Sequence, residues 1–298
     1  MYEQIAGNKR KSFLLVFLFM GLIFLLAWLF EQAAGMGTPG LVAAVVIALA
    51  MTVGSYYASD KIVLAMSKAR PVTKEEFPYL YNVVEGLTIA AGIPPPRCYV
   101  IDDTAPNAFA TGRNPKNSVI VVTTGLLEKL NRVELEGVIA HEMSHIKNYD
   151  VLLQTLTVVM VGVVALLSDW MRRTFWWGGG RRRSSDRGKG SGGTAIILAL
   201  ALIMAILSPL IAQLIRFAIS RKREFLADAS GAMLTRYPPG LASALKKIAA
   251  DKEPLEAANK ATAHLYIVNP LLDHGGRINK LFSTHPPIEE RIAALEKM

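Results

Sequence analysis

The stretch Asn131–Asp150 reads NRVELEGVIAHEMSHIKNYD and decides how the rest of the chain is interpreted. Asn131 and Glu134 have the spacing of a capping box, so a helix is predicted to begin there. His141 and His145 lie four residues apart, so both imidazoles lie on one helix face, one turn apart. Two imidazoles can hold one zinc ion, and the adjacent Glu142 can take a proton from a water that attacks a carbonyl. The pattern indicates a metal-dependent hydrolase.

Two histidines leave the metal site incomplete, and the residues alone leave the third ligand open. A third histidine six residues after His145 is excluded, because that position is Val151. Asp150 is near in sequence but, on a continuous helix, would point in another direction. The other candidate is Glu224, with Asp228 one turn further on. One of these carboxylates could bind the metal while the other orients a ligand histidine through its second ring nitrogen. The alternative without a metal is that Glu224 forms a surface ion pair with its basic neighbours.

The composition indicates an integral membrane protein with substantial water-facing parts. Hydrophobic residues make up 52% of the 298 residues and charged residues 19%, below the ~25% that is usual for soluble proteins. The mean hydropathy is +0.32. The single cysteine, Cys98, excludes a disulfide framework and a four-cysteine zinc site.

Four apolar runs are predicted to cross the bilayer, since 18 helical residues reach ~27 Å. They are Phe13–Phe30, Leu41–Ala58, Val151–Ser168 and Ala195–Ile215. The basic residues that flank the first two runs place residues 1–12, 59–150 and 216–298 in the cytoplasm.

The basic, Gly/Ser-rich loop 169–193 opposes this topology, because four full spans would place it outside. The alternative is that the last two runs form a hairpin that does not cross. Anionic lipid headgroups are the expected partner of the loop. A nucleic acid is not expected, because no binding fold accompanies the charge.

Short apolar segments predict a small sheet beside the histidine helix. The expected strands are Arg97–Asp102, Asn107–Thr111 and Ser118–Thr123, with a turn at Gly112–Asn117 between the last two. A helix is predicted from the capping-box pair Thr73 and Glu76 to Gly92, and a final one over Ile288–Lys297. The histidine helix is expected to continue through Asp150 into the third apolar run.

Taken together, these motifs resemble the HtpX family of bacterial membrane zinc metalloproteases, which is related to the CAAX prenyl endoprotease. The resemblance rests on HExxH, the later Glu224 and Asp228, and three further segments: Asn107–Gly112 (NAFATG), Ser283–Pro287 (STHPP) and Glu290–Arg291. It implies a mainly α membrane protein of about four transmembrane helices with a cytoplasmic, zincin-like α+β catalytic domain. The parts are an N-terminal hairpin 1–58, catalytic segments 59–150 and 216–298, and a second hairpin 151–215.

The resemblance also implies roles for single residues. His141, His145 and Glu224 would bind one zinc ion, Glu142 would be the general base and Asp228 would support a ligand. Asn107 would help to hold the substrate carbonyl, and His285 would hydrogen-bond the developing oxyanion. An edge strand would pair with an extended peptide through its backbone; its residues are Ala108, Phe109, Ala110 and Thr111.

The implied function is quality control in the plasma (inner) membrane: cleavage of misfolded or damaged membrane proteins by an active site that faces the cytoplasm. Three alternatives stay open: a prenyl-protein protease, a membrane receptor or transporter with an incidental metal site, and a catalytically dead metal-binding scaffold. The presence of Glu142 argues against the last of these.

Overall fold

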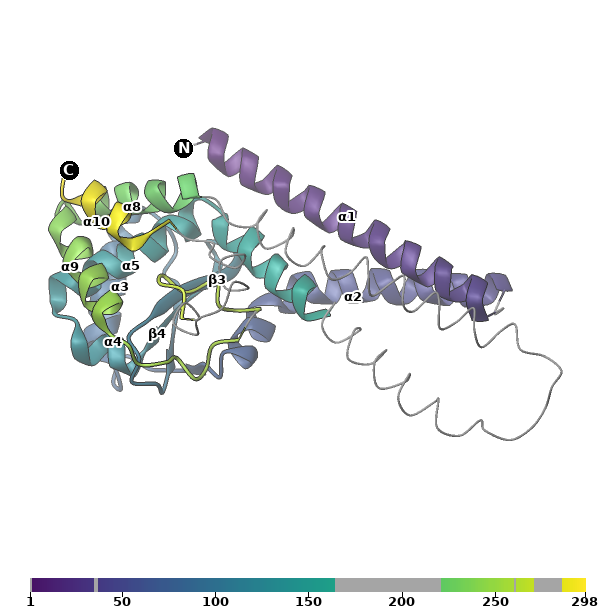
Figure 1. Cartoon of the computed structure of the whole chain (residues 1–298), viewed down its shortest axis with the longest axis horizontal. Coiled ribbons are helices and arrows are strands. Elements are labelled where there is room, and N and C mark those ends of the chain that lie inside the picture. Colours follow the sequence, from purple (N-terminus) through teal and green to yellow (C-terminus); the bar gives the residue numbers. More distant parts are fainter. Residues whose placement is uncertain (1, 35–36, 164–220, 260, 271–285) are drawn as a thin grey trace.

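The computed structural model describes residues 2–34, 37–163, 221–259, 261–270 and 286–298. A rounded body holds the sheet and the shorter helices, and two long helices extend from one side of it (Figure 1). The predicted basic loop 169–193, the fourth apolar run and His285 lie outside the described residues.

The two long helices contain the first two apolar runs. They are α1 (Tyr2–Ala34) and α2 (Gly37–Met66), and they pack against each other. Residues 150–163 form a further helix, which leaves the body on the same side (Figure 1). Among the residues that the structure describes, no helix is both long enough and apolar enough to cross a membrane. The four spans predicted from the sequence are therefore not confirmed.

The body contains a four-stranded sheet in the order β1-β2-β4-β3. Its strands are β1 (Arg70–Pro71), β2 (Arg97–Ile101), β3 (Ala108–Asn114) and β4 (Asn117–Thr123). β2 and β4 are parallel and the other two pairs are antiparallel, so β3 is an edge strand. The three predicted strands are present, but the turn is shorter than expected. A bulge at Gly112–Asn114, with Gly112 at φ 137°, keeps those residues in β3.

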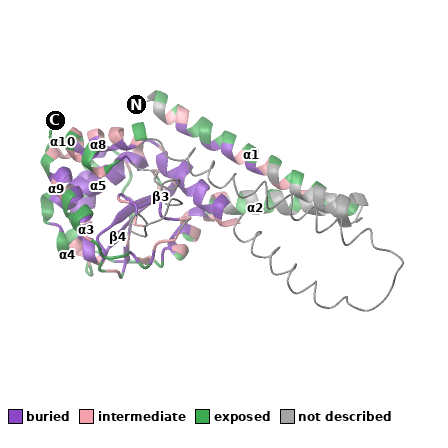
Figure 2. Cartoon of the chain, in the orientation of Figure 1, coloured by how far each residue is buried: buried purple, intermediate pink, exposed green. Residues whose placement is uncertain are grey.

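Helix α5 (Arg132–Lys147) lies at the centre of the body. It packs against α3 (Pro78–Ala91), α8 (Arg221–Thr235), α9 (Pro238–Ala250) and β3, while α4 (Thr124–Lys129) and α10 (Ile288–Leu295) complete the body. Figure 2 shows this centre buried and the outer helix faces exposed. Glycines permit the close crossings. A Cβ on Gly137 would lie 2.7 Å from the Leu241 nitrogen, and one on Gly231 would lie 3.0 Å from the His141 nitrogen.

Two predicted helix limits are wrong: the start of α3 and the end of α10. Helix α3 begins at Pro78 rather than at Thr73, because proline suits the first helical turn. The Glu76 nitrogen still donates to Thr73 Oγ1, but within a turn. The final helix ends at Leu295, two residues earlier than predicted.

Candidate metal centre

Local sequence chemistry places the two histidines of α5. The helix begins with the predicted capping box, in which Asn131 and Glu134 each accept from the other's backbone nitrogen. From that start, His141 and His145 face the same side and are buried, with their Nε2 atoms 3.2 Å apart. Their rings meet edge to face, with centroids 4.8 Å apart.

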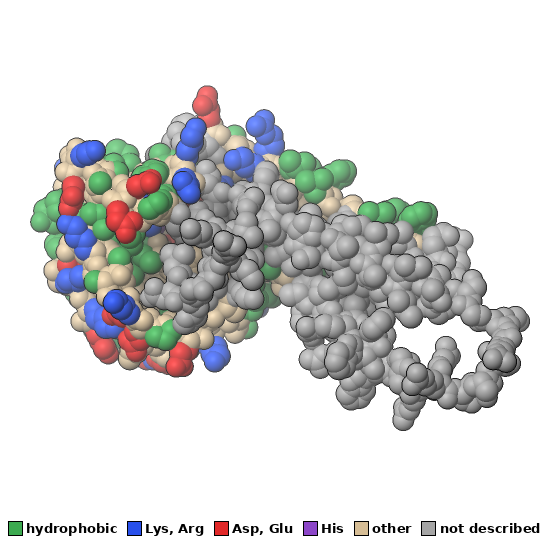
Figure 3. All heavy atoms as spheres, viewed as in Figure 1, with side chains coloured by type: hydrophobic (Ala, Val, Ile, Leu, Met, Phe, Trp, Pro, Cys, Tyr) green, Lys and Arg blue, Asp and Glu red, His purple; other side chains and the backbone are tan. Residues whose placement is uncertain are grey.

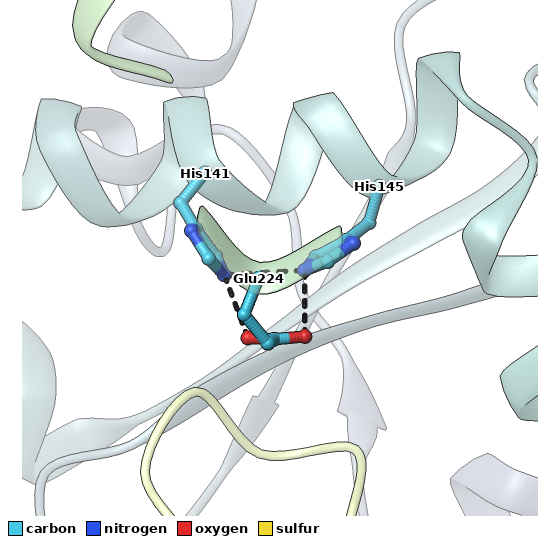
Figure 4. A group of neighbouring side chains, drawn as sticks. All are labelled: His141, His145 and Glu224. Carbon is cyan, nitrogen blue, oxygen red and sulfur yellow. Dashed lines mark hydrogen bonds and ion pairs between the residues drawn. The ribbon is translucent and has the colours of Figure 1, made fainter. Parts of the chain in front are cut away.

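Glu224 of α8 completes a three-residue cluster. Its carboxylate oxygens lie 3.8 Å from His141 Nε2 and 3.6 Å from His145 Nε2. Figure 4 shows both imidazoles pointing from α5 toward this carboxylate. One ligand atom from each residue lies within 4.8 Å of the others, and all three residues are buried. Of the two candidates for a third ligand, Glu224 is the one that meets the histidines at Nε2.

The outer nitrogen of each histidine has its own carboxylate. His141 Nδ1 lies 2.8 Å from Asp228 Oδ1, and His145 Nδ1 lies 3.1 Å from Asp150 Oδ2. Hydrogen bonds at Nδ1 leave the Nε2 lone pairs directed at the centre of the cluster. Two such lone pairs 3.2 Å apart repel unless a proton or a metal cation lies between them.

The predicted continuous helix is wrong: α5 ends before Asp150, and this break lets Asp150 reach His145. Helix α5 ends at Lys147 with Asn148 as its cap, and Tyr149 adopts the left-handed conformation at φ 59°. A new helix starts at residue 150. The break turns the Asp150 carboxylate back toward the preceding helix, which the azimuth of an unbroken helix would not permit.

Arg291 of α10 supports the Asp228 side of the cluster. Its guanidinium binds both Asp228 oxygens, at 2.8 and 2.7 Å, and a third nitrogen donates to the Ile267 carbonyl at 2.8 Å. The side chain is 1% exposed. The paired geometry orients Asp228 and places a cation 3.5 Å from His141 Nδ1.

Burial and charge shift the pKa values of Asp228, His141, His145 and Glu142. Burial opposes ionisation of Asp228, but Arg291 and the His141 hydrogen bond lower its pKa to about 2. Burial lowers the pKa of His141. For His145, burial also acts downward, yet the Asp150 hydrogen bond and the nearby Glu224 raise its pKa to about 9. Burial raises the pKa of Glu142 to about 7.

Glu142 lies between the cluster and the edge strand. It is buried, and its carboxylate accepts a hydrogen bond from the backbone nitrogen of Ala110. Phe109 alternates to the other side of the sheet and packs on Tyr266, as expected for successive strand residues. The base predicted from the sequence therefore contacts the predicted substrate strand.

The outer edge of β3 is partly occupied by the chain itself. The Ile267 nitrogen donates to the Ala108 carbonyl at 2.9 Å. Thr155 bonds both the Thr111 hydroxyl and the Gly112 nitrogen. A peptide that pairs with the whole strand would therefore compete with the segment around Ile267.

The Asn107 amide has partners within the fold. Its Nδ2 donates to the Val268 carbonyl at 2.9 Å, while its Oδ1 accepts from the nitrogens of Ala108 and Val268. These hydrogen bonds tie Asn107 to the segment next to β3. The predicted role of Asn107 at a substrate carbonyl stays a prediction.

Sequence reasoning gave no role to Arg291, although a signal was present. Ile288, Arg291, Ile292 and Leu295 follow the spacing of one helix face, so a charged residue stood among apolar ones. A charge on a buried face needs a partner. Nothing in the sequence indicated that the partner is Asp228.

The donor set fits a zinc ion. Two imidazole nitrogens with fixed tautomers and one carboxylate are a usual set for a catalytic zinc that keeps one position open. The site also gathers the buried carboxylates of Glu142, Glu224, Asp150 and Asp228. A divalent cation would offset this charge and separate the facing Nε2 lone pairs.

Comparisons with known proteins agree with this chemistry. The model of peptidase family M48 matches residues 74–298. A "Protease HtpX homolog" of Dictyoglomus turgidum is 54% identical over 297 residues, covering 100% of this chain and 94% of that protein. Another from Thermoanaerobacter pseudethanolicus is 47% identical over 298 residues, covering 100% and 98%.

A solved structure gives the same fold. The crystal structure of S. mikatae Ste24p aligns with 99% of this chain and 67% of its own, at 20% identity and a TM-score of 0.52. That similarity concerns the fold alone, whereas the family follows from the matched model and the close relatives. The chain belongs to peptidase family M48 and is a metalloprotease.

Proposed function

We propose that this metalloprotease is an integral-membrane zinc endopeptidase that cleaves exposed segments of misfolded or damaged membrane proteins. The observation that carries the proposal is the convergence of His141, His145 and Glu224 beside Glu142 and an edge strand. His141, His145 and Glu224 would hold the zinc ion. When bound, zinc would polarise the scissile carbonyl and make an attacking water more acidic.

Glu142 is the proposed general base. It takes a proton from the water as the new C–O bond forms, and passes that proton to the amine nitrogen as the peptide C–N bond breaks. In the metal-free protein burial raises its pKa to about 7, near the value at which one group can both take and release a proton at neutral pH. The hydrogen bond from Ala110 supports the role, because it holds the carboxylate beside the strand that would align a peptide.

Exposed apolar side chains support the membrane location. Phe13, Phe17 and Leu18 of α1 are 76%, 66% and 58% exposed, and Val42, Val46 and Val53 of α2 are similarly exposed. Figure 3 shows hydrophobic side chains on the surface of α1 beyond its first turns, while acidic and basic side chains lie on the body and at the start of α1. Apolar surface of this extent needs a partner such as lipid. The flanking basic residues support a cytoplasmic active site.

The metal and the base can be tested separately on the purified full-length chain. The wild type should contain about one equivalent of zinc and cleave an unfolded membrane protein. Glu224→Ala should lose the metal. Glu142→Gln should keep it but lose cleavage by a factor of at least about 10²–10⁴, the usual contribution of a general base.

Glu136→Gln is the matched control, because Glu136 lies on the same helix in an exposed pair with Arg132. It should retain zinc and activity. Appreciable turnover by Glu142→Gln would remove Glu142 from the role of base, and zinc retained by Glu224→Ala would exclude Glu224 as the third ligand. The predicted oxyanion role of His285 has the same assay: His285→Ala should keep zinc and lose turnover.

A further inference from the structure

The N-terminal helix reaches the metal centre through one buried amide. Asn8 of α1 is 5% exposed. Its Nδ2 donates to Asp150 Oδ1 at 2.7 Å and to the Asn148 carbonyl at 2.8 Å. These partners are 140 and 142 residues away in sequence, and they lie at the break between α5 and the following helix.

The same carboxylate supports a proposed zinc ligand. The other oxygen of Asp150, Oδ2, lies 3.1 Å from His145 Nδ1. Asn8, Asp150 and His145 thus form one hydrogen-bonded chain from α1 to the Nε2 atom that faces Glu224. Rotation of the Asp150 carboxylate would turn the imidazole, so the donor on Asn8 bears on its orientation.

Asn8 also contacts the helix that carries the third ligand. Its Oδ1 accepts from Arg223 Nη1 at 3.4 Å, and Arg223 Nε lies 3.6 Å from Asp150 Oδ1. Arg223 precedes Glu224 in α8. A neutral amide suits this position, because it offers a donor to the carboxylate and an acceptor to the guanidinium at once.

The contact is part of a packed interface. Lys9 lies over the Tyr149 ring at 4.2 Å. Asn8, Ser12 and Leu15 are buried at the spacing of one face of α1. The contacts of Asn8 and Lys9 hold this part of α1 against the segment that joins α5 to the following helix.

We propose that Asn8 is a positioning residue for the metal centre: through Asp150 it holds His145 in the orientation that binds zinc. Helix α1 then supports the active site as well as anchoring the chain. This inference rests on the proposed zinc site. It predicts that loss of the Asn8 amide weakens metal binding by about tenfold, the low end of the effect of removing a group that orients a ligand.

The test measures zinc affinity of the full chain in detergent by competition with a chromophoric chelator, together with the absorption spectrum of the cobalt-substituted protein. Asn8→Ala should bind zinc about tenfold more weakly and show an altered cobalt spectrum. Asn8→Asp, which keeps the shape but loses the donor, should bind at least as weakly as Asn8→Ala. Ser12→Ala, one turn further along the same buried face, should leave both readouts unchanged.

A double-mutant cycle separates positioning from general destabilisation. In an Asp150→Ala background, Asn8→Ala should cause no further loss of zinc affinity, because the intermediate group is already gone. Equal losses in both backgrounds, or wild-type affinity in Asn8→Ala, would overturn the proposal. Failure of the zinc site itself would look different: the wild type would bind no zinc, whatever residue stands at position 8.

Discussion

The buried pair of Arg291 and Asp228 gives a sharp test of how the site is held. Both residues are 1% exposed, and the guanidinium binds the carboxylate through two hydrogen bonds. Arg291→Met keeps much of the side-chain volume but leaves Asp228 as a buried carboxylate without its cation. Breaking such a pair from one side costs about 3–5 kcal/mol of unfolding free energy.

That cost converts into a measurable shift of the unfolding temperature. For a folded unit of 150–250 residues, each kcal/mol moves the midpoint by about 2–4 °C, so Arg291→Met should lower it by about 6–20 °C. The assay is thermal unfolding of the metal-free chain, because bound metal would stabilise the folded state on its own account. Lys246→Met is the control: its ion pair with Glu296 is exposed and is worth at most about 1 kcal/mol.

The partner variant decides whether the loss belongs to the pair. Asp228→Asn alone leaves a buried guanidinium facing an amide, whereas the double variant removes both charges. The double variant should therefore unfold at a higher temperature than the sum of the two single losses predicts. Additive losses, or a shift of less than 2 °C for Arg291→Met, would refute the reasoning that a buried ion pair fixes the Asp228 side of the site.

Three further predictions follow from the fold and the site. Gly137→Ala should lower the free energy of unfolding, measured by denaturation, by about 1–3 kcal/mol, since the added Cβ meets the α9 backbone. The control Gly86→Ala, which has open space beside α3, should be neutral or stabilising in that assay. The raised pKa of Glu142 destabilises the metal-free protein progressively as pH rises from about 4.5 to about 7. Glu142→Gln should therefore have a larger free energy of unfolding than the wild type at pH 8, by on the order of 3 kcal/mol, and this difference should vanish near pH 4. An equal difference at both pH values would contradict the burial of an ionisable base. For topology, Ser191→Cys in a Cys98→Ala background should react with an impermeant thiol reagent in intact cells if two crossings separate His145 from Glu224; labelling only after lysis would mean that the hairpin returns to the cytoplasm.

The parts of the site that the sequence could predict are local. The capping box of Asn131 and Glu134 and the shared face of His141 and His145 depend on spacings of three and four residues along one helix, which periodicity determines. Glu224 was one of two candidates for the third ligand from the residues alone, and the resemblance then favoured it over Asp150. The resemblance supplied the chemistry of Glu224, and the packing of α8 on α5 gives it a place.

The rest required tertiary structure, because no spacing rule connects distant elements. Asp150 was assigned the wrong direction, since the 100° rule for a helix assumes no break and Tyr149 introduces one. The amide of Asn107 is bonded to Val268, a residue 161 positions away, which no spacing rule indicated. Its predicted contact with a substrate carbonyl stays a prediction. The sequence gives the chemistry of a polar side chain but does not identify its hydrogen-bond partner.

The proposed metal centre depends on a residue outside the region that the family model matches. The matched family region begins at residue 74, and a fragment that starts there would contain His141, His145, Glu224 and the base. It would lack Asn8, so Asp150 would lose the donor that stands opposite His145. The proposed zinc ligands come from the body, while the proposed orientation of His145 depends on α1. Any displacement of α1 relative to the body would therefore act on His145 through Asn8 and Asp150.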